Sequence, residues 1–583
     1  MKNKYIDLVE QSFEFPQDEF RVEDGALYFH DIPMMDVIAQ YGTPLKISYL
    51  PKISSQIQRA KRMFNVAMAK VDYQGDYHYC YCTKSSHFSF VLEEALKNDI
   101  HIETSSAFDF NLIESLYDSK TVDKDLYIIC NGYKKDTYIA NIAQFINNGW
   151  HNTIPILDNM PELDQLDAVI NEPTRIGIRI AAEEEPKFEF YTSRLGIRYK
   201  DIMPFYQEKL SHNKKFSLKM LHFFINTGIK DNAYYWNELG KCVNVYCNLK
   251  AVCPTLDSLN IGGGLPIKNS LGMDYDYEYM IEEVVAQIKS ICNSRGVEEP
   301  NIFTEFGSYT VGESGATIFS ILGVKQQNDR EKWYMVDSSF MTTLPDIWGI
   351  KQKFILLPIN KWDQPYERVF LGGLTCDSQD YYNAEEHANA IFLPKVSPDD
   401  PEPLYIGFFH TGAYQESIAG YGGIRHCLQP MLDSVRDPGN VGTILRLADW
   451  FGIETVYLSP DCADMYNPKT IQATMGSIFR QKTTICDLVH LARNCRTAGI
   501  PVYSTALEGG EDIRTVPLKT DRALVIMGSE RDGVSPALLD ESVRRIYIPS
   551  AAEGTSDRAE SLNVAIATAI TCYEMRLRRL PTI

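Results

Sequence analysis

Apolar and polar positions alternate in a regular way over the first half of the chain. Short apolar runs such as YHYCYC and LYIIC are each followed by a longer stretch with helical periodicity, such as HFSFVLEEALKN and YKKDTYIANIAQFINN. Strands that alternate with helices at this spacing predict a parallel sheet. About eight such repeats between residues 51 and 310 predict a (β/α)₈ barrel.

The pattern changes twice after the barrel. Residues 311–428 are rich in strand-like segments such as ATIFSILGVKQQ and FILLPIN, which predict a separate antiparallel β domain. Residues 1–50, which include the strand pattern YGTPLKISYL, are expected to contribute to this domain. From residue 429 to 583, strand, Gly-rich turn, helix and strand follow one another again, which predicts a second α/β domain. The chain is therefore predicted to be a multidomain α/β protein.

Charge is distributed unevenly between these parts. Residues 429–583 hold 17 Lys+Arg against 19 Asp+Glu, whereas residues 1–428 hold 40 against 58. A strongly acidic first part repels phosphates, which argues against nucleic acid as its ligand. The start of the chain lacks an apolar signal core and no apolar run is long enough for a membrane span, so we expect a cytoplasmic protein without membrane contact. The 13 cysteines are expected to be reduced thiols, and no metal site is predicted.

Residues suited to catalysis follow several of the predicted barrel strands. Lys84 follows the strand YHYCYC, three glycines at 262–264 follow another strand, and Glu305 ends a third. Because chemistry in a barrel takes place at the carboxyl ends of its strands, these groups are expected to share one face. A triple-glycine turn lets backbone N–H groups close on an anion such as a phosphate.

Residues 1–428 resemble the alanine-racemase-fold decarboxylases, and among them the arginine decarboxylases most. The resemblance is carried by segments in family order: the YGTPL strand, Lys84, Ile129–Lys134, Ser193–Gly196, Gly262–Gly264, Thr375–Ser378 and Gly412–Tyr414. It implies a pyridoxal 5′-phosphate (PLP) enzyme that removes CO₂ from a small basic amino acid, with arginine favoured and polyamine synthesis as the setting. It also implies a homodimer.

The same resemblance implies a role for each group. Lys84 binds the cofactor covalently, and Glu305 faces the ring nitrogen. The phosphate is held by the remaining cofactor-binding residues, namely Gly262, Gly263, Gly264, Thr227 and Tyr414. Cys376 returns a proton to the product and Asp377 pairs with the distal cation of the substrate, both across the dimer interface.

Two positions depart from the family pattern. Phe224 stands where the family has a histidine that stacks on the cofactor ring, and Ser308 stands where it has an arginine near the phosphate. A phenyl ring can stack but cannot donate a proton. Because the lysine, the carboxylate and the Cys-Asp pair remain, we still expect an active enzyme.

Residues 430–583 resemble the SpoU (TrmH-like) RNA methyltransferases, whose α/β domain ends in a trefoil knot of the SPOUT type. Three family motifs occur in order: Asp437–Arg446, Leu524–Val534, and Ile546–Pro549 followed by Glu560–Ala565. The resemblance implies S-adenosylmethionine-dependent methylation of ribose 2′-hydroxyls in tRNA or rRNA.

Roles in this second domain also follow from the resemblance. Arg446 acts as a fixed cation that lowers the pKa of the ribose hydroxyl. The polar site is completed by Asn440, Glu530, Ser561 and Asn563, and the backbone around Gly528, Ile548 and Leu562 binds S-adenosylmethionine.

Two alternatives to a bifunctional enzyme stay open. In one, the chain is a fusion or joining artefact in which only one half is active, an interpretation that the absence of a linker favours. On this interpretation the resemblance to the decarboxylases implies that their β domain, residues 311–428 here, is truncated near Leu428. In the other, one half is a non-catalytic scaffold for dimerisation or RNA binding.

Overall fold

The computed structural model describes residues 15, 18–183, 192–384, 391–397, 400–415, 427–453, 455–497, 500–515, 522–529, 531–550 and 561–576. The chain divides into two compact units, Met1–Gly423 and Ile424–Ile583. Among the described residues, no helix combines the length and apolar content that a membrane span requires.

The first unit contains a closed barrel of eight parallel strands, as predicted. The strands are β5 (Tyr77–Cys82), β6 (His101–Thr104), β7 (Ile128–Cys130), β8 (Thr153–Leu157), β9 (Thr174–Arg179), β10 (Phe216–His222), β11 (Ser258–Asn260) and β12 (Asn301–Glu305). The barrel closes where β12 pairs with β5, which places Glu305 opposite Cys80. Strand β8 is buried along its whole length, as expected where both faces of a parallel sheet are covered.

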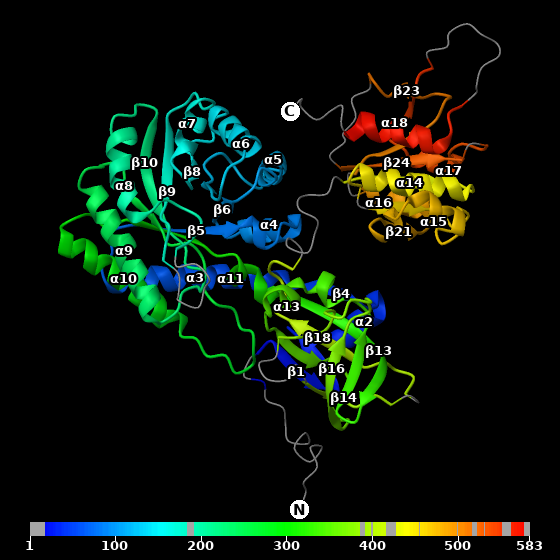
Figure 1. Cartoon of the computed structure of the whole chain (residues 1–583), viewed down its shortest axis with the longest axis horizontal. Helices are drawn as coiled ribbons and strands as arrows, with labels where there is room; N and C mark the ends of the chain where they lie inside the picture. Colours follow the sequence, from blue (N-terminus) through cyan, green and yellow to red (C-terminus); the bar gives the residue numbers. More distant parts are fainter. Residues whose placement is uncertain are drawn as a thin grey trace, which may run out of the picture. The chain divides into compact units, whose positions relative to one another are not determined.

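Helices surround the barrel strands (Figure 1). They are α3 (Leu50–Lys70), α4 (Ser89–Leu96), α5 (Asp109–Asp118), α6 (Asp136–Asn147), α7 (Pro161–Asp167), α8 (Tyr199–Phe205), α9 (Ala233–Lys250) and α10 (Tyr277–Arg295). Helix α3 buries Ile53, Ile57, Ala60 and Phe64. Their spacing of three or four residues forms one apolar face that packs on the barrel.

The second part of the first unit is a sheet of seven strands. These are β4 (Leu45–Ser48), β13 (Gly315–Asn328), β14 (Glu331–Val336), β15 (Ile355–Pro358), β16 (Tyr366–Gly372), β17 (Ile391–Pro394) and β18 (Tyr405–Phe409). Strand β4, from the start of the chain, pairs with β13. The sheet is antiparallel as predicted except between β14 and β16, which run parallel. This exception arises because β15 lies between them in sequence but at the far edge of the sheet.

Short elements complete the first unit outside the barrel and the large sheet. A small sheet comprises β1 (Phe20–Glu23), β2 (Ala26–Phe29) and β3 (Ile32–Pro33), followed by α2 (Met34–Tyr41). The helices α11 (Ser308–Val311), α12 (Phe340–Thr343) and α13 (Pro345–Ile350) are each six residues or shorter. Phe20 and Phe29 pack with Ile318 and Phe409, so the beginning of the chain shares a core with β13 and β18.

The second unit is a parallel sheet flanked by helices. In spatial order its strands are β21 (Lys482–Ile485), β20 (Thr455–Leu458), β19 (Cys427–Asp433), β24 (Arg522–Gly528), β22 (Val502–Thr505), β25 (Arg544–Tyr547) and β23 (Glu511–Asp512). The helices are α14 (Pro438–Trp450), α15 (Pro468–Thr474), α16 (Leu488–Thr497), α17 (Pro536–Glu541) and α18 (Val564–Arg576). Strand β19 begins at Cys427, so the boundary expected after residue 428 falls inside this strand.

Candidate active sites

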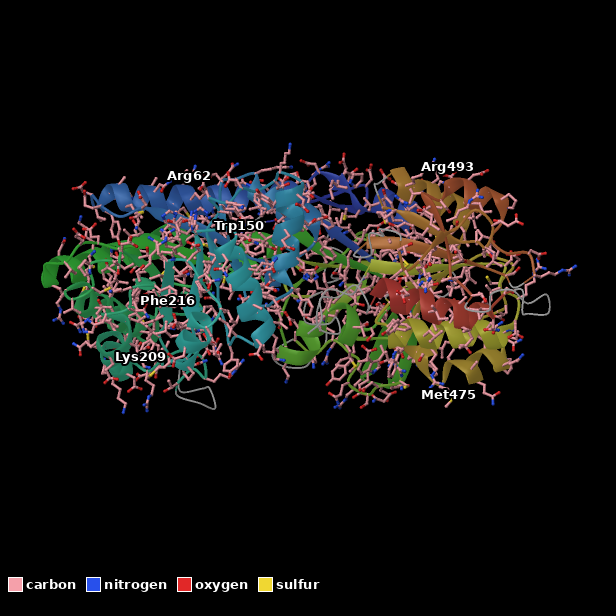
Figure 2. The ribbon with its side chains drawn as sticks, turned by 90° about the horizontal axis from the view of Figure 1, so that it is seen from above. Arg62, Trp150, Lys209, Phe216, Met475 and Arg493 are labelled. Carbon is pink, nitrogen blue, oxygen red and sulfur yellow. The ribbon has the colours of Figure 1, made fainter. Side chains whose placement is uncertain are left out.

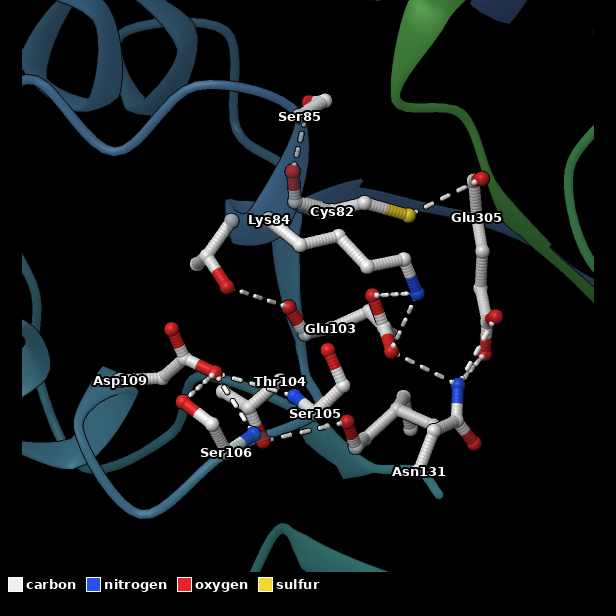
Figure 3. A network of polar contacts seen from close by, with 12 residues as sticks. Cys82, Lys84, Ser85, Glu103, Thr104, Ser105, Ser106, Asp109, Asn131 and Glu305 are labelled. Atoms are coloured by element: carbon white, nitrogen blue, oxygen red, sulfur yellow. Dashed lines mark hydrogen bonds and ion pairs between the residues drawn. The ribbon is translucent and has the colours of Figure 1, made fainter. Parts of the chain in front are cut away.

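Polar side chains of the first unit gather at the carboxyl ends of the barrel strands. Lys84 lies in a short 3₁₀ turn (Thr83–Ser85) directly after β5, and its Nζ lies 3.1 Å from both carboxylate oxygens of Glu103 on β6. Asn131, after β7, donates through Nδ2 to Glu103 at 3.0 Å and to Glu305 at 2.9 Å (Figure 3). One amide therefore bridges two buried carboxylates, and Lys84 contacts one of them.

Glu305 has further partners from two other strand ends. Its carboxylate accepts a hydrogen bond from Asn260 Nδ2 at 2.6 Å and lies 3.2 Å from His222 Nε2. Burial raises the pKa of Glu305, but the charge and hydrogen bond of His222, together with Lys84 and Asn131, lower it well below its usual value. Glu305 is thus held as a carboxylate.

The two carboxylates of the network are shifted in opposite directions. Burial, with the charge of Glu305, raises the pKa of Glu103 despite the opposing effect of Lys84. Burial lowers the pKa of Lys84, yet the charge of Glu103 outweighs it and the pKa is raised. The Lys84 side chain is 43% exposed, so a ligand that enters the barrel mouth can reach its amine.

The triple-glycine turn lies directly against Glu305. Glu305 N donates to Gly262 O at 2.8 Å, and a Cβ on Gly263 would lie 2.4 Å from Glu305 O. Gly262 and Gly264 have φ values of +70° and +103°, a region that favours glycine. A Cβ on Gly264 would also meet Gly228, the residue after Thr227, at 2.7 Å. Only glycines allow this close backbone packing.

Phe224 lies beside this turn, and Tyr414 lies beside Lys84. Phe224 Cδ2 is 3.1 Å from the position that a Cβ on Gly262 would take. Tyr414 N donates to Ser85 O at 2.7 Å, next to Lys84, and the Tyr414 hydroxyl is 3.1 Å from the Cβ position of Gly307. The β domain therefore brings one hydroxyl to the mouth of the barrel.

Cys376 and Asp377 lie elsewhere. They follow β16 in an exposed loop where Asp377 Oδ1 accepts from Gln379 N at 2.8 Å. Within the described part of the chain, no hydrogen bond or ion pair joins either residue to Lys84 or Glu305. A single copy of the chain does not bring these two residues into the Lys84 network.

Sequence reasoning did not single out Glu103, His222, Asn260 or Arg179 as site residues. Each is the last or next-to-last residue of a barrel strand, and that position is the signal that would have found them. Three buried atoms here lack a hydrogen-bond partner among the described residues: Asn131 Oδ1, Arg179 Nε and His222 Nδ1. Unpaired polar atoms beside a reachable amine and a glycine cradle fit a polar, phosphate-bearing ligand such as PLP.

In the second unit the first and third motifs meet. Asp437 caps α14 by accepting from Asn440 N at 2.9 Å, so the cap of this helix is Asp437. The Asn440 side chain accepts a hydrogen bond from Asn563 Nδ2 at 3.0 Å. Arg446 is exposed on the same helix.

The second motif forms a tight turn at the end of β24. A Cβ on Gly528 would lie 2.1 Å from the carbonyl carbon of Gly533, and Gly533 N donates to Ser529 O at 3.0 Å. Glu530, which follows Ser529 in the sequence, lies outside the described residues. Ser561 and Leu562 are exposed just before α18, and Ile548 follows β25.

Two family models match the two units. Residues 52–312 match the pyridoxal binding domain of pyridoxal-dependent decarboxylases, and residues 428–573 match the SpoU rRNA methylase family. These matches confirm both resemblances and both cofactors that the motifs implied.

Individual relatives agree. Arginine decarboxylase 1, chloroplastic, of Arabidopsis thaliana is 23% identical over 68% of this chain and 72% of its own length. The 23S rRNA (guanosine(2553)-2′-O)-methyltransferase RlmP of Bacillus subtilis is 37% identical over 25% of this chain, which spans 56% of that relative.

Among solved structures, the biosynthetic arginine decarboxylase of Campylobacter jejuni shares the fold of the first unit. Its TM-score is 0.58 at 20% identity, covering 72% of this chain and 84% of that one. The chain therefore joins an arginine-decarboxylase-like domain to a SpoU-type RNA methyltransferase domain.

Proposed function

We propose that the first unit decarboxylates a basic amino acid, with arginine as the preferred substrate. The observation that carries this proposal is the network of Lys84, Glu103, Asn131 and Glu305 at one end of the barrel. Arginine is favoured because arginine decarboxylases recur among the similar proteins. The product would enter polyamine synthesis.

The residues present define how the cofactor would be held. Lys84 would bind it covalently, Glu305 would face its ring nitrogen, and the turn Gly262–Gly264 with Thr227 and Tyr414 would hold its phosphate. When bound, PLP supplies an electron sink for the charge left by the loss of CO₂. Glu305, ionised and fixed by Asn131, would keep a proton on the ring nitrogen.

Cys376 and Asp377 are proposed to act from the partner protomer of a homodimer. In the described part of the chain, no hydrogen bond or ion pair links their exposed loop to Lys84, which fits a loop that completes a neighbouring site. Cys376 would deliver a proton to the product carbon, and Asp377 would bind the distal cation of the substrate.

The test for this half is CO₂ release by the purified chain from arginine, ornithine, lysine, diaminopimelate and a carboxylated polyamine. Arginine should give the highest kcat/KM. Lys84→Ala should abolish release and the absorbance of the bound cofactor. A wild-type chain that binds no cofactor would instead support a scaffold role.

We infer that the second unit methylates ribose 2′-hydroxyls in tRNA or rRNA, within a trefoil-knotted domain. The contact between Asn440 and Asn563 supports this, because it joins the first motif to the third. Arg446 would stabilise the ribose oxyanion, with Glu530 and Ser561 beside it. Gly528, Ile548 and Leu562 would bind S-adenosylmethionine through their backbone.

The surface of α18 supports a homodimer for this unit too. Ile566 and Tyr573 are each 52% exposed and, with the partly exposed Ala569 and Ile570, form an apolar stripe at helical spacing. Transfer of labelled methyl groups to tRNA or rRNA tests the activity, and Arg446→Ala should abolish transfer while leaving S-adenosylmethionine bound.

A further inference from the structure

Helix α14 presents an exposed face next to the methyltransferase site. The helix buries Val441, Ile444, Leu445 and Ala448, whereas Arg446 and Trp450 are exposed. Residues four positions apart on a helix are neighbours on its surface, so Trp450 lies one turn from Arg446. The Trp450 side chain is 81% exposed and therefore contributes little to the core of this unit.

A second exposed aromatic side chain lies on the segment tied to the end of α14. Arg480 donates through Nε and Nη2 to Asp449 Oδ2 at 3.0 and 2.7 Å, and these two residues adjoin Phe479 and Trp450. The Phe479 side chain is 89% exposed. Met475, at the end of α15, is also on the surface (Figure 2). Trp450 and Phe479, which are the chain neighbours of the ion-paired Asp449 and Arg480, are named here the aromatic patch.

The chemistry of the patch favours RNA as its occupant. Unpaired bases stack on aromatic side chains, and a guanidinium group such as that of the exposed Arg446 adds a phosphate or stacking contact. The near balance of charge in residues 429–583 limits general attraction of phosphates, so stacking has to supply affinity. The apolar stripe of α18 is better suited than the aromatic patch to bind a second copy of the chain.

We propose that Trp450 stacks on an unpaired base of the RNA next to the nucleotide to be methylated, and that Phe479 extends this platform. The proposal rests on the RNA methylation proposed above. It identifies the substrate as RNA that is single-stranded at the target, such as a loop.

The experiment compares the full-length wild-type chain with Trp450→Ala, Trp450→Phe and Phe479→Ala. Leu507→Ala is the matched control, because Leu507 is 64% exposed elsewhere in the same unit. The probes are an oligoadenylate strand, a duplex of the same length and total rRNA. Loss of the stacking contact with one base should weaken oligoadenylate binding and raise KM for rRNA by about 5- to 150-fold. Trp450→Phe should restore most of the loss.

Affinity for S-adenosylmethionine, sedimentation and melting temperature should stay unchanged in all four variants. If the wild-type chain methylates rRNA and both Trp450→Ala and Phe479→Ala bind RNA as well as the wild type, the proposed stacking platform is wrong and the proposed methylation is unaffected. Dissociation of an oligomer by Trp450→Ala would assign the patch to a second copy instead. A wild-type chain that neither binds nor methylates RNA would overturn the proposed function together with the platform.

Discussion

The two candidate sites differ in where they keep their polar groups. In the first unit, Glu103, Asn131 and Glu305 are buried and hydrogen-bonded to one another at the carboxyl ends of the barrel strands. In the second, Asn440, Arg446 and Asn563 lie towards the surface, and one side-chain hydrogen bond joins two of them. A site that stabilises charge on a small molecule can be built inside the fold, whereas a site for a large RNA has to stay accessible. Substitutions should therefore be more costly in the first site than in the second.

The largest contrast should come from Lys84→Ala and Arg446→Ala. Because the two sites belong to different units, Lys84→Ala should lower decarboxylation by at least about a thousandfold and leave methyl transfer unchanged. Arg446→Ala should do the reverse. Both rates are measured on the same preparation, and loss of both activities in either variant would show that the sites are coupled.

Asn131→Asp should destabilise the first unit strongly. The new carboxylate would face Glu103 and Glu305 in a buried position, which costs roughly 3–5 kcal/mol when a buried charge lacks a partner. Calorimetric unfolding measures the change. Asn563→Ala is the counterpart in the second unit and should cost only about 1 kcal/mol, since it removes an exposed hydrogen bond to Asn440 and the contacts by which Asn563 Oδ1 caps α18 at Ala565 N and Ile566 N. Equal losses of unfolding free energy in the two variants would contradict the contrast between the two sites.

Gly263→Ala should lower cofactor affinity without unfolding the barrel. The added methyl group would lie 2.4 Å from Glu305 O, and overpacking of this kind costs about 1–3 kcal/mol. Gly272→Ala is the control, because its Cβ would meet no atom within 4 Å. Equilibrium dialysis of PLP distinguishes the two variants, and identical affinities would show that the turn has room to adjust.

Acid should destabilise the first unit through three largely buried groups, namely Glu19 and His30 before the barrel and His101 on strand β6. His410 lies 2.8 Å from Glu19, and although burial raises the pKa of Glu19, His410 and Lys52 lower it to about 2. Burial also lowers the pKa values of His30 and His101 to about 4.

These lowered pKa values determine how the stability of the first unit changes with pH. All three groups have folded pKa values below their ordinary ones, so the unfolded chain binds more protons as the pH falls. The stability they contribute is complete above about pH 6.5, declines toward pH 4 with the histidines, and declines further toward pH 2 with Glu19. Glu19→Gln should flatten the acid limb of the unfolding free energy measured below pH 4.5. An unchanged pH profile would show that Glu19 does not contribute to the acid sensitivity of the first unit.

The sequence predicts more of the architecture than of the contacts. Periodicity predicted the barrel, and the motifs selected Lys84, Glu305 and the glycine turn, which the structure places together. Glu103 and His222 were not singled out, because which strand ends become neighbours depends on how the barrel closes. The parallel pairing of β14 with β16 was not predicted for a similar reason, because the spatial order of these strands does not follow their order in the chain.

Strand β19 has a practical consequence for any attempt to separate the two activities. It is the first strand of the second unit in sequence, yet it lies between β20 and β24 in the middle of the sheet. A methyltransferase fragment that started at residue 429 would lack Cys427 and Leu428, which pair with Arg522 and Ala523. A cleavage site engineered upstream of Cys427 would release a piece that keeps this interior strand whole.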